Sequence, residues 1–477
     1  MIVNKKGLHK DRQASRIEKY EHMRKKGETA MENNMTTGNP GKLIVRFTLP
    51  VFIGNVFQQF YSMVDAVIVG KFVGTKALAG VGATGTINFL IIGFLLGLTA
   101  GFTVLTAQKY GAGDLGAMRK TVASAAILSL VVSVVMTAAS VIFMKNLLRL
   151  MNTPEDIFDY AYEYIVIICA GIFAQVLYNL LSSVLRALGN SRTPLYFLIL
   201  AALLNVVLDL VFIVCFHMGP AGAAYATVIA QGISGAACLL YIWKAVPQLH
   251  LHKGDWKVEG SLLKTQMRIG FPMALQYSIT AIGTMMVQSA LNLLGSISVA
   301  AFTAASKIEQ IVTQAYVALG TAMATYCAQN MGAGDVQRIR HGFRSATILG
   351  SVYSVVAAVL MVSVGHYLTY LFVEAADVPK VIGEVRTYLI CVSVFFIPLT
   401  VVNLYRNGIQ GMGYGFLPMT AGIAELVGRG VVAVIASWQR SYVGVCLASP
   451  MAWVLAGALL LWMYFRIMRN LDQNPSA

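Results

Sequence analysis

The chain contains 477 residues, of which 57% are hydrophobic and 12% are charged. A mean hydropathy of +0.68 excludes an ordinary water-soluble globular protein, in which about a quarter of the residues are charged. The formal net charge of +15 does not indicate nucleic-acid binding, because Lys and Arg gather in the connections between apolar segments, where anionic lipid attracts them.

The first 40 residues are polar and carry both signs of charge, without an apolar run that would form a signal peptide. We expect residues 1–40 to be a polar cytoplasmic tail. Because Met31 and Met35 closely precede the first apolar segment, Met1, Met31 and Met35 all stay open as the natural start of translation.

Twelve apolar segments follow, each long enough to cross a hydrocarbon core of about 30 Å as an α-helix. They lie near 47–70, 84–107, 121–144, 158–181, 194–216, 219–243, 269–294, 306–328, 345–372, 382–402, 416–437 and 441–465. Backbone groups in lipid must hydrogen-bond within the protein, so runs of this length are helical and cannot form a porin-like barrel. The sequence therefore predicts an all-α membrane protein with twelve transmembrane helices.

Lys and Arg are unevenly distributed between the two sides of the predicted membrane. They are concentrated before the first segment, in the even-numbered connections and after the last segment, whereas the odd-numbered connections contain few. The positive-inside rule then predicts that both termini are cytoplasmic. Membrane lipids are expected partners and nucleic acid is not.

The chain repeats itself. AQKYGAGD at 107–114 recurs as AQNMGAGD at 328–335, and Pro194 recurs as Pro418 within a similar context. Six helices return the chain to its starting side, so two six-helix lobes would be related by an axis along the membrane normal. We expect the following organisation: an N-lobe at 41–243, a cytoplasmic linker at 244–268, a C-lobe at 269–466 and a cytoplasmic tail at 467–477. Such lobes suit a transporter, although channels and scaffolds are also built by duplication.

Asp65 and Asp209 are the most informative charges within the apolar segments, because a carboxylate in hydrocarbon costs at least about 2.5–3.5 kcal/mol. Asp65 lies about six residues before Lys71, roughly 9 Å below the predicted outer surface. Asp209 and Thr227 are predicted at a similar depth. Asn205 precedes Asp209 by one helical turn and so shares its face.

Two carboxylates, an amide and a hydroxyl at one level would supply the hard oxygen ligands that a metal cation such as Na⁺ prefers. The same pair of carboxylates would alternatively hold a proton. A purely structural role also stays open, in which both side chains accept hydrogen bonds from neighbouring helices.

Other polar and aromatic residues are candidates to line a substrate cleft between the lobes, although similar stripes usually only pack helices. These candidates are Phe57, Gln58, Tyr61, Gln276, Tyr277, Lys307 and Glu309. Glu425 and Arg429 are four residues apart and are expected to neutralise each other in a structural pair.

No enzymatic motif accompanies these features. The two GAGD sequences resemble the GxGD of intramembrane proteases, but each is predicted to end one helix and to cap the next through Asp114 or Asp335. HExxH, GxSxG, Walker A and dinucleotide motifs are missing from the sequence. We therefore expect neither an enzyme nor a cofactor.

Several segments together resemble the multidrug and toxic compound extrusion (MATE) family of bacterial efflux transporters. They are LPVFIGNVFQQFYSMVDAVIVGKFVG at 49–74, AQKYGAGD at 107–114, RALGNSRTP at 186–194, NVVLDLVFI at 205–213, GPAGAAYAT at 219–227 and AQNMGAGD at 328–335. The resemblance covers roughly 40–470. It implies a V-shaped pair of lobes in the bacterial inner membrane that exports small organic, often cationic, drug-like compounds in exchange for Na⁺ or H⁺.

The resemblance also assigns roles to residues. Asp65, Asn205, Asp209 and Thr227 match the N-lobe cation site of the family, which the carbonyl group of Ala223 would join. Some relatives carry a carboxylate in the seventh span, where this chain has Gln276 and Thr280. We therefore hypothesise that coupling is confined to the N-lobe of a monomeric transporter.

Two other functions stay open. A flippase for lipid-linked oligosaccharides or peptidoglycan precursors would favour a cleft rich in Lys and Arg, and few such residues fall within the predicted spans. A non-transporting scaffold or receptor would leave the aligned acidic group without a purpose. Secondary antiport is the function that uses the acidic group.

Overall fold

The computed structural model describes residues 34–151, 153–257, 259–371 and 378–473. Most of the predicted tail at 1–40 and the last four residues of the tail at 467–477 lie outside these ranges. All regular secondary structure in the described residues is helical, which confirms the predicted all-α class.

The first half of the chain contains eight α-helices and a short π-helix. Their bounds are α2 (Pro40–Phe72), α3 (Thr75–Ala83), α4 (Gly85–Gly111), α5 (Leu115–Leu150), α6 (Glu155–Ala170), α7 (Ile172–Ala187), α8 (Arg192–Asp209), η1 (Leu210–Cys215) and α9 (Gly219–Ala245). Two 3-10 turns connect the halves, η2 (Pro247–Leu249) and η3 (Lys253–Trp256).

The second half repeats this order. Its elements are α10 (Gly260–Asn292), α11 (Ser296–Gly332), α12 (Val336–Ser363), η4 (Gly365–Leu371), α13 (Val378–Ser393), α14 (Phe396–Gly411), α15 (Phe416–Gln439) and α16 (Tyr442–Gln473). Helices α7 and α14 each have 16 residues. The continuous segment α8–η1 and its counterpart α15 each have 24 residues, so the duplication keeps its register in the structure.

The helices group into twelve membrane-length units. Eight single helices are long and apolar enough to span a membrane, and two further spans are the pairs α6–α7 and α13–α14, which bend by 50° and 51°. The remaining two, α10 and α11, have 33 and 37 residues but carry more polar side chains, because they lie where the lobes meet. The predicted twelve-helix architecture is consistent with these units.

The repeated GAGD sequence ends one helix and begins the next in both halves. Gly113 and Gly334 have positive φ values of 75° and 74°, which stop α4 and α11. The following Asp114 and Asp335 cap α5 and α12 by accepting hydrogen bonds of 2.8 Å from backbone N–H groups. The capping role predicted for this motif is therefore confirmed.

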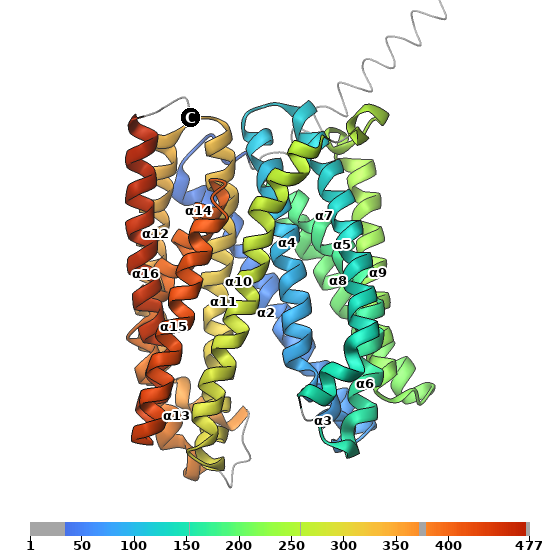
Figure 1. Cartoon of the computed structure of the whole chain (residues 1–477), viewed down its shortest axis with the longest axis vertical. Coiled ribbons are helices and arrows are strands. Elements are labelled where there is room, and N and C mark those ends of the chain that lie inside the picture. The colour runs from blue at the N-terminus through green and yellow to red at the C-terminus, as the bar shows by residue number, and fades with distance from the viewer. Residues whose placement is uncertain (1–33, 152, 258, 372–377, 474–477) are drawn as a thin grey trace, which may run out of the picture.

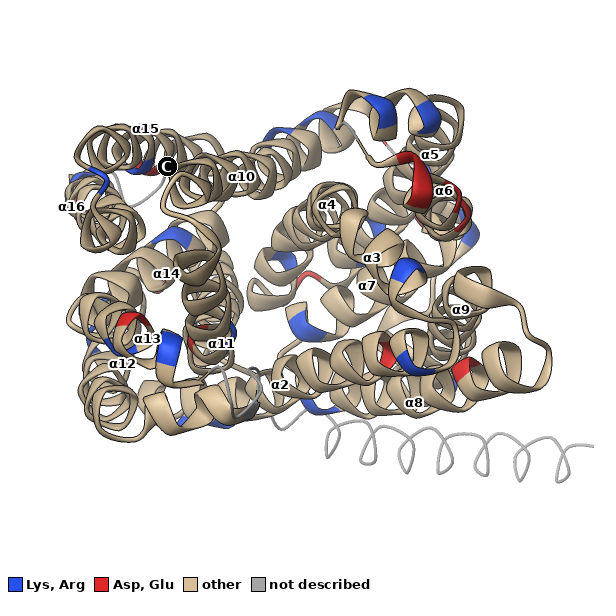
Figure 2. Ribbon diagram, turned by 90° about the horizontal axis from the view of Figure 1, so that it is seen from below, with Lys and Arg blue, Asp and Glu red and all other residues tan. Residues whose placement is uncertain are grey.

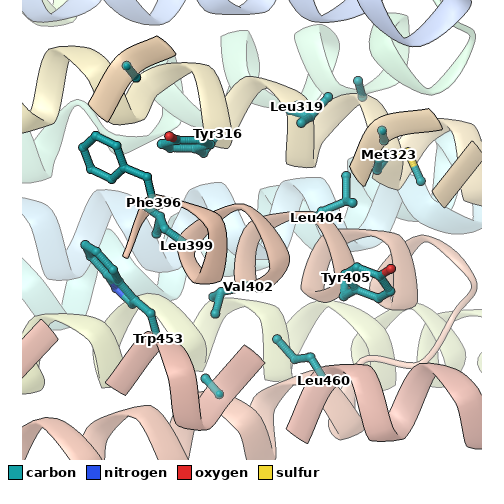
Figure 3. Close-up of a cluster of buried hydrophobic side chains, with 14 of the residues drawn as sticks. Tyr316, Leu319, Met323, Phe396, Leu399, Val402, Leu404, Tyr405, Trp453 and Leu460 are labelled. Atoms are coloured by element: carbon teal, nitrogen blue, oxygen red, sulfur yellow. The ribbon is translucent and has the colours of Figure 1, made fainter. Parts of the chain in front are cut away.

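The two halves form two bundles that lie side by side, with both described ends of the chain at the same end of the molecule (Figure 1). We call this the termini end. Viewed along the helices, α4 lies against α10 and α2 lies against α11 (Figure 2). The largest apolar cluster gathers mainly C-lobe side chains and includes Ile44 and Phe47 of α2. In the C-lobe, Tyr316 of α11, Phe396 of α14 and Trp453 of α16 pack together (Figure 3).

The lobes touch most closely at the termini end. A Cβ atom added at Gly111 would overlap the backbone of Gln329, and one at Gly332 would overlap the backbone of Gln108. Across this contact Gln108 Nε2 donates a 3.1 Å hydrogen bond to the carbonyl oxygen of Gly411. Reciprocally, Gln329 Nε2 donates a 2.8 Å hydrogen bond to the carbonyl oxygen of Ala187.

Candidate functional site

The side chains of Asp65 and Asp209 come together in the N-lobe. Asp65 lies on α2 and Asp209 is the last residue of α8, and the two carboxyl groups interact electrostatically. Asp209 is fully buried and Asp65 is half-buried. Apart from the contact between the two carboxyl groups themselves, no group within the described residues donates a hydrogen bond to either carboxyl oxygen of Asp209 or to Asp65 Oδ1.

Asn205 and Thr227 extend this pair. Asn205 is buried, and its Nδ2 donates a 3.3 Å hydrogen bond to Thr227 Oγ1 on α9. This bond leaves the buried Asn205 Oδ1 as an acceptor without a donor among the described residues. Ala223 is fully buried on α9, one turn before Thr227. Helices α2, α8 and α9 thus all contribute to one group of polar residues, Asp65, Asn205, Asp209 and Thr227, and we use the word pocket as a name for this group.

The backbone changes form directly after Asp209. Helix α8 continues there as the π-helical turn η1 (Leu210–Cys215). Such turns are rare in proteins and are frequent at functional sites. The sequence around Asp209 carries no glycine or proline that would have predicted this change.

Two tyrosines complete the surroundings of the carboxyl groups. Tyr61 on α2 and Tyr164 on α6 both interact electrostatically with Asp65 and Asp209. Tyr61 was predicted to face a substrate cleft, and the structure places it beside the acidic pair. Tyr164 was not predicted as a site residue. It lies on the buried face of α6 together with Ala161, Ile165 and Ile168, and their helical spacing in the sequence could have indicated that Tyr164 points into the protein.

The pocket offers only oxygen atoms to a small cation. Unpartnered carboxyl and amide oxygens, with a hydroxyl group beside them, are the ligands that hard cations prefer, and two adjacent carboxyl groups are equally suited to sharing a proton. Among the described residues, no group of three or more His, Cys, Asp and Glu side chains is placed to hold a metal ion.

The other predicted cleft residues do not form one cluster. Phe57 and Gln58 are exposed on α2, and Lys307 is exposed on α11. Glu309 is half-buried and accepts a hydrogen bond from the hydroxyl group of Tyr388. Gln276 and Tyr277 lie on α10, where Gln276 Oε1 accepts a 2.7 Å hydrogen bond from Gln410 Nε2.

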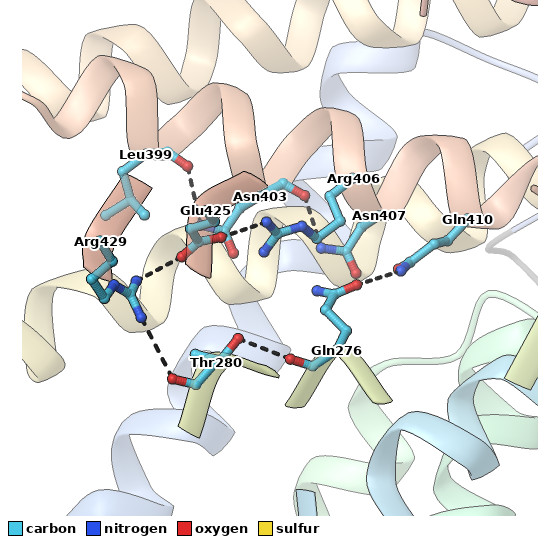
Figure 4. Close-up of polar contacts among 9 residues, drawn as sticks. All are labelled: Gln276, Thr280, Leu399, Asn403, Arg406, Asn407, Gln410, Glu425 and Arg429. Atoms are coloured by element: carbon cyan, nitrogen blue, oxygen red, sulfur yellow. Dashed lines mark hydrogen bonds and ion pairs between the residues drawn. The ribbon is translucent and has the colours of Figure 1, made fainter. Parts of the chain in front are cut away.

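A second buried polar cluster lies in the C-lobe (Figure 4). The predicted contact between Glu425 and Arg429 is present, with Arg429 Nη2 donating to Glu425 Oε1 at 2.7 Å. Arg406, which was not predicted as part of this cluster, donates from its Nη2 to the other carboxylate oxygen at 2.6 Å. Because Arg406 lies on α14 and Glu425 on α15, no spacing within one helix reveals this contact.

Comparisons with known proteins agree with this architecture. The MatE family profile matches residues 50–211 and 269–435. The chain is 34% identical over 378 residues to the probable multidrug resistance protein YpnP of Bacillus subtilis, covering 79% of this chain and 83% of that protein. It is 23% identical over 441 residues to an FAD transporter of Shewanella oneidensis, covering 90% and 95% of the two chains.

Solved structures show the same fold. One describes the outward-facing conformation of a multidrug resistance MATE family transporter; its TM-score is 0.86 at 24% identity, with 91% of this chain and 98% of that chain covered. Another is a MATE protein in complex with MaL6, with a TM-score of 0.87 at 24% identity and coverage of 92% and 99%. The chain is a multi-pass membrane transporter rather than an enzyme, and it belongs to the MATE family of multidrug efflux transporters.

Proposed function

We propose that this chain exports small organic compounds by antiport, and that the pocket of Asp65, Asn205, Asp209 and Thr227 binds the coupling Na⁺ or H⁺. The observation that carries the proposal is the contact between the fully buried carboxyl group of Asp209 and the half-buried one of Asp65. No other described group donates a hydrogen bond to Asp209. Names of relatives such as YpnP support drug-like substrates, which are expected to be cationic in many cases.

The physical argument concerns charge. Two neighbouring carboxylates repel each other, and burial penalises each charge further. A cation or a proton entering the pocket relieves both costs, and it draws α2, α8 and α9 toward a common ligand. If this tightening lowers the affinity of the N-lobe for substrate, substrate must lower the affinity for the cation by the same factor.

The pocket lies far from the termini end, because α2 and α8 both begin at that end and Asp65 and Asp209 lie toward their other ends. The proposal places both termini in the cytoplasm and the pocket in the outer half of a bacterial inner membrane. It treats the transporter as a monomer in contact with lipid. The flippase and the scaffold are rival proposals.

Inverted membrane vesicles that contain the protein provide the test. A cationic dye is added outside, and Na⁺ and proton gradients are imposed independently. We expect one of the two gradients to drive dye accumulation, and dissipating that gradient to stop it. Dye accumulation that needs neither gradient would rule out antiport. A lack of dye transport would favour the flippase or the scaffold.

A further inference from the structure

The buried cluster of the C-lobe contains more positive than negative charge at short range. Glu425 receives one hydrogen bond from Arg406 and one from Arg429, at 2.6 and 2.7 Å (Figure 4). All three side chains are more than nine-tenths buried. Two guanidinium groups therefore share one carboxylate.

The guanidinium groups also keep unused donors. Each Arg carries five N–H donors, and the Nε atoms of Arg406 and Arg429 are buried without a partner among the described residues. Arg429 Nη1 approaches the carbonyl oxygen of Thr280 only to 3.5 Å, which is long for a hydrogen bond. A buried donor without an acceptor is costly, so the cluster is suited to a further acceptor.

The internal repeat relates one residue of this cluster to the cation pocket. The segments Arg192–Cys215 and Phe416–Gln439 have equal length, so Asn205 corresponds in position to Arg429, and Asp209 corresponds to Ala433. Where the N-lobe presents a carboxylate and an amide, the C-lobe presents a guanidinium group and a methyl group. At these two positions the C-lobe therefore has no acidic side chain, and at one of them it carries a positive charge.

The cluster borders the region between the lobes. Arg406 interacts electrostatically with Tyr277 on α10, and Tyr277 interacts in the same way with Arg186 on α7 of the N-lobe. A Cβ atom at Gly93 on α4 would lie 3.2 Å from the Tyr277 ring, so this tyrosine stands at the junction of the lobes. It is 37% exposed. The polar pair Gln276–Gln410 lies beside Arg406 (Figure 4).

One other acidic side chain acts on the cluster. Glu309 of α11 interacts electrostatically with Arg429, while the hydroxyl group of Tyr388 donates a hydrogen bond to it. The ion pairs formed by the described part of the chain join Glu425, and not Glu309, to the two guanidinium groups. Glu309 therefore does not serve as the acceptor for the unpartnered Nε–H donors of Arg406 and Arg429.

We propose that the Arg406–Glu425–Arg429 cluster binds a carboxylate group of the transported molecule, so that among the compounds that enter between the lobes the protein prefers zwitterions to simple cations. Guanidinium groups form strong, planar, charge-assisted hydrogen bonds with carboxylates. The inference rests on the proposed function in that it assigns a substrate class to the same transporter, but binding requires no ion gradient.

Equilibrium binding to the purified protein in detergent tests the proposal. The probes are a rhodamine with a free carboxyl group and its methyl ester, which differ in the charge of that group and by one methyl group. We expect the wild-type protein to bind the acid at least tenfold more tightly than the ester. Equal affinities of the wild-type protein for the two dyes would overturn the proposal. This result would not bear on whether the protein is an antiporter.

The variant Arg406→Gln leaves Glu425 and Arg429 as a balanced pair. It is expected to lose the preference for the acid while keeping its affinity for the ester, and Arg406→Lys is expected to restore part of the preference. Arg466→Gln, which removes an exposed charge on α16, serves as the matched control. An equal loss of affinity for both dyes would assign Arg406 to structure, and an unchanged preference would likewise refute the site.

Discussion

The side-chain amide of Gln329 donates a 2.8 Å hydrogen bond to the carbonyl oxygen of Ala187, and so joins the end of α11 in the C-lobe to the end of α7 in the N-lobe. Gln108 forms the equivalent bond in the opposite direction, to Gly411 at the end of α14. Gln329 Oε1 also accepts a 2.9 Å hydrogen bond from the backbone N–H of Met35. The duplicated Ala-Gln dipeptides thus tie the two lobes together reciprocally.

These bonds predict the effect of removing either amide. Gln329→Ala loses two of these hydrogen bonds and Gln108→Ala loses one. The termini end is therefore expected to open more readily in both variants, and most readily in Gln329→Ala. Hydrogen–deuterium exchange at residues 185–190 and 408–413 measures this opening. Gln288→Ala removes an exposed bond within α10 and is the control. Exchange that equals the control in both variants would show that the amides do not hold the lobes.

Glu425→Gln is expected to destabilise the protein more than Arg406→Gln does. The first change leaves two buried guanidinium groups without a counter-charge, whereas the second leaves one balanced pair. Breaking a buried ion pair costs about 3–5 kcal/mol. Thermal unfolding in detergent gives the order of the two midpoints, and a Glu425→Gln midpoint at or above that of Arg406→Gln would contradict this view of the cluster.

The connection between the lobes is expected to loosen in acid. The backbone N–H of His252 donates to Asp255 and, with Arg119 3.3 Å away, lowers the pKa of this carboxyl group below its usual value. A lowered pKa stabilises the folded form above the unfolded value of about 3.9, and that stability is lost as the pH falls through the folded pKa. The protection of the amides at residues 252–256, measured relative to their intrinsic exchange rates at each pH, should then fall.

Asp255→Asn tests the same contact at neutral pH. The amide keeps the size of the side chain but loses the charge that attracts Arg119. Protection of the amides at residues 252–256 is expected to be weaker than in the wild-type protein and nearly independent of pH. If protection in this variant still falls in acid as much as in the wild-type protein, Asp255 is not the group responsible.

Much of the architecture was predictable because membranes restrict it so strongly. Apolar segments of membrane length require helices, and the repeated GAGD sequence fixed helix ends through Gly113 and Gly334. The one-turn spacing of Asn205 and Asp209 likewise places both on one buried face of α8. These features depend on local sequence alone.

Other features depend on contacts between helices and were not predictable in this way. Tyr164 reaches the acidic pair because α6 packs beside α9, which itself packs against α8. Arg406 reaches Glu425 because α14 and α15 bring the two side chains together. The π-helical turn after Asp209 has no local sequence signal. The tertiary arrangement decides each of these positions.

The most direct test of the central claim is the effect of the coupling cation on dye binding by wild-type and Asp209→Asn protein. In the wild-type protein, raising Na⁺ or H⁺ is expected to weaken dye binding. In Asp209→Asn this dependence should vanish while the dye still binds, and the exposed Glu163→Gln control should behave as wild type. A cation dependence that survives in Asp209→Asn would contradict coupling through the Asp65–Asp209 pocket.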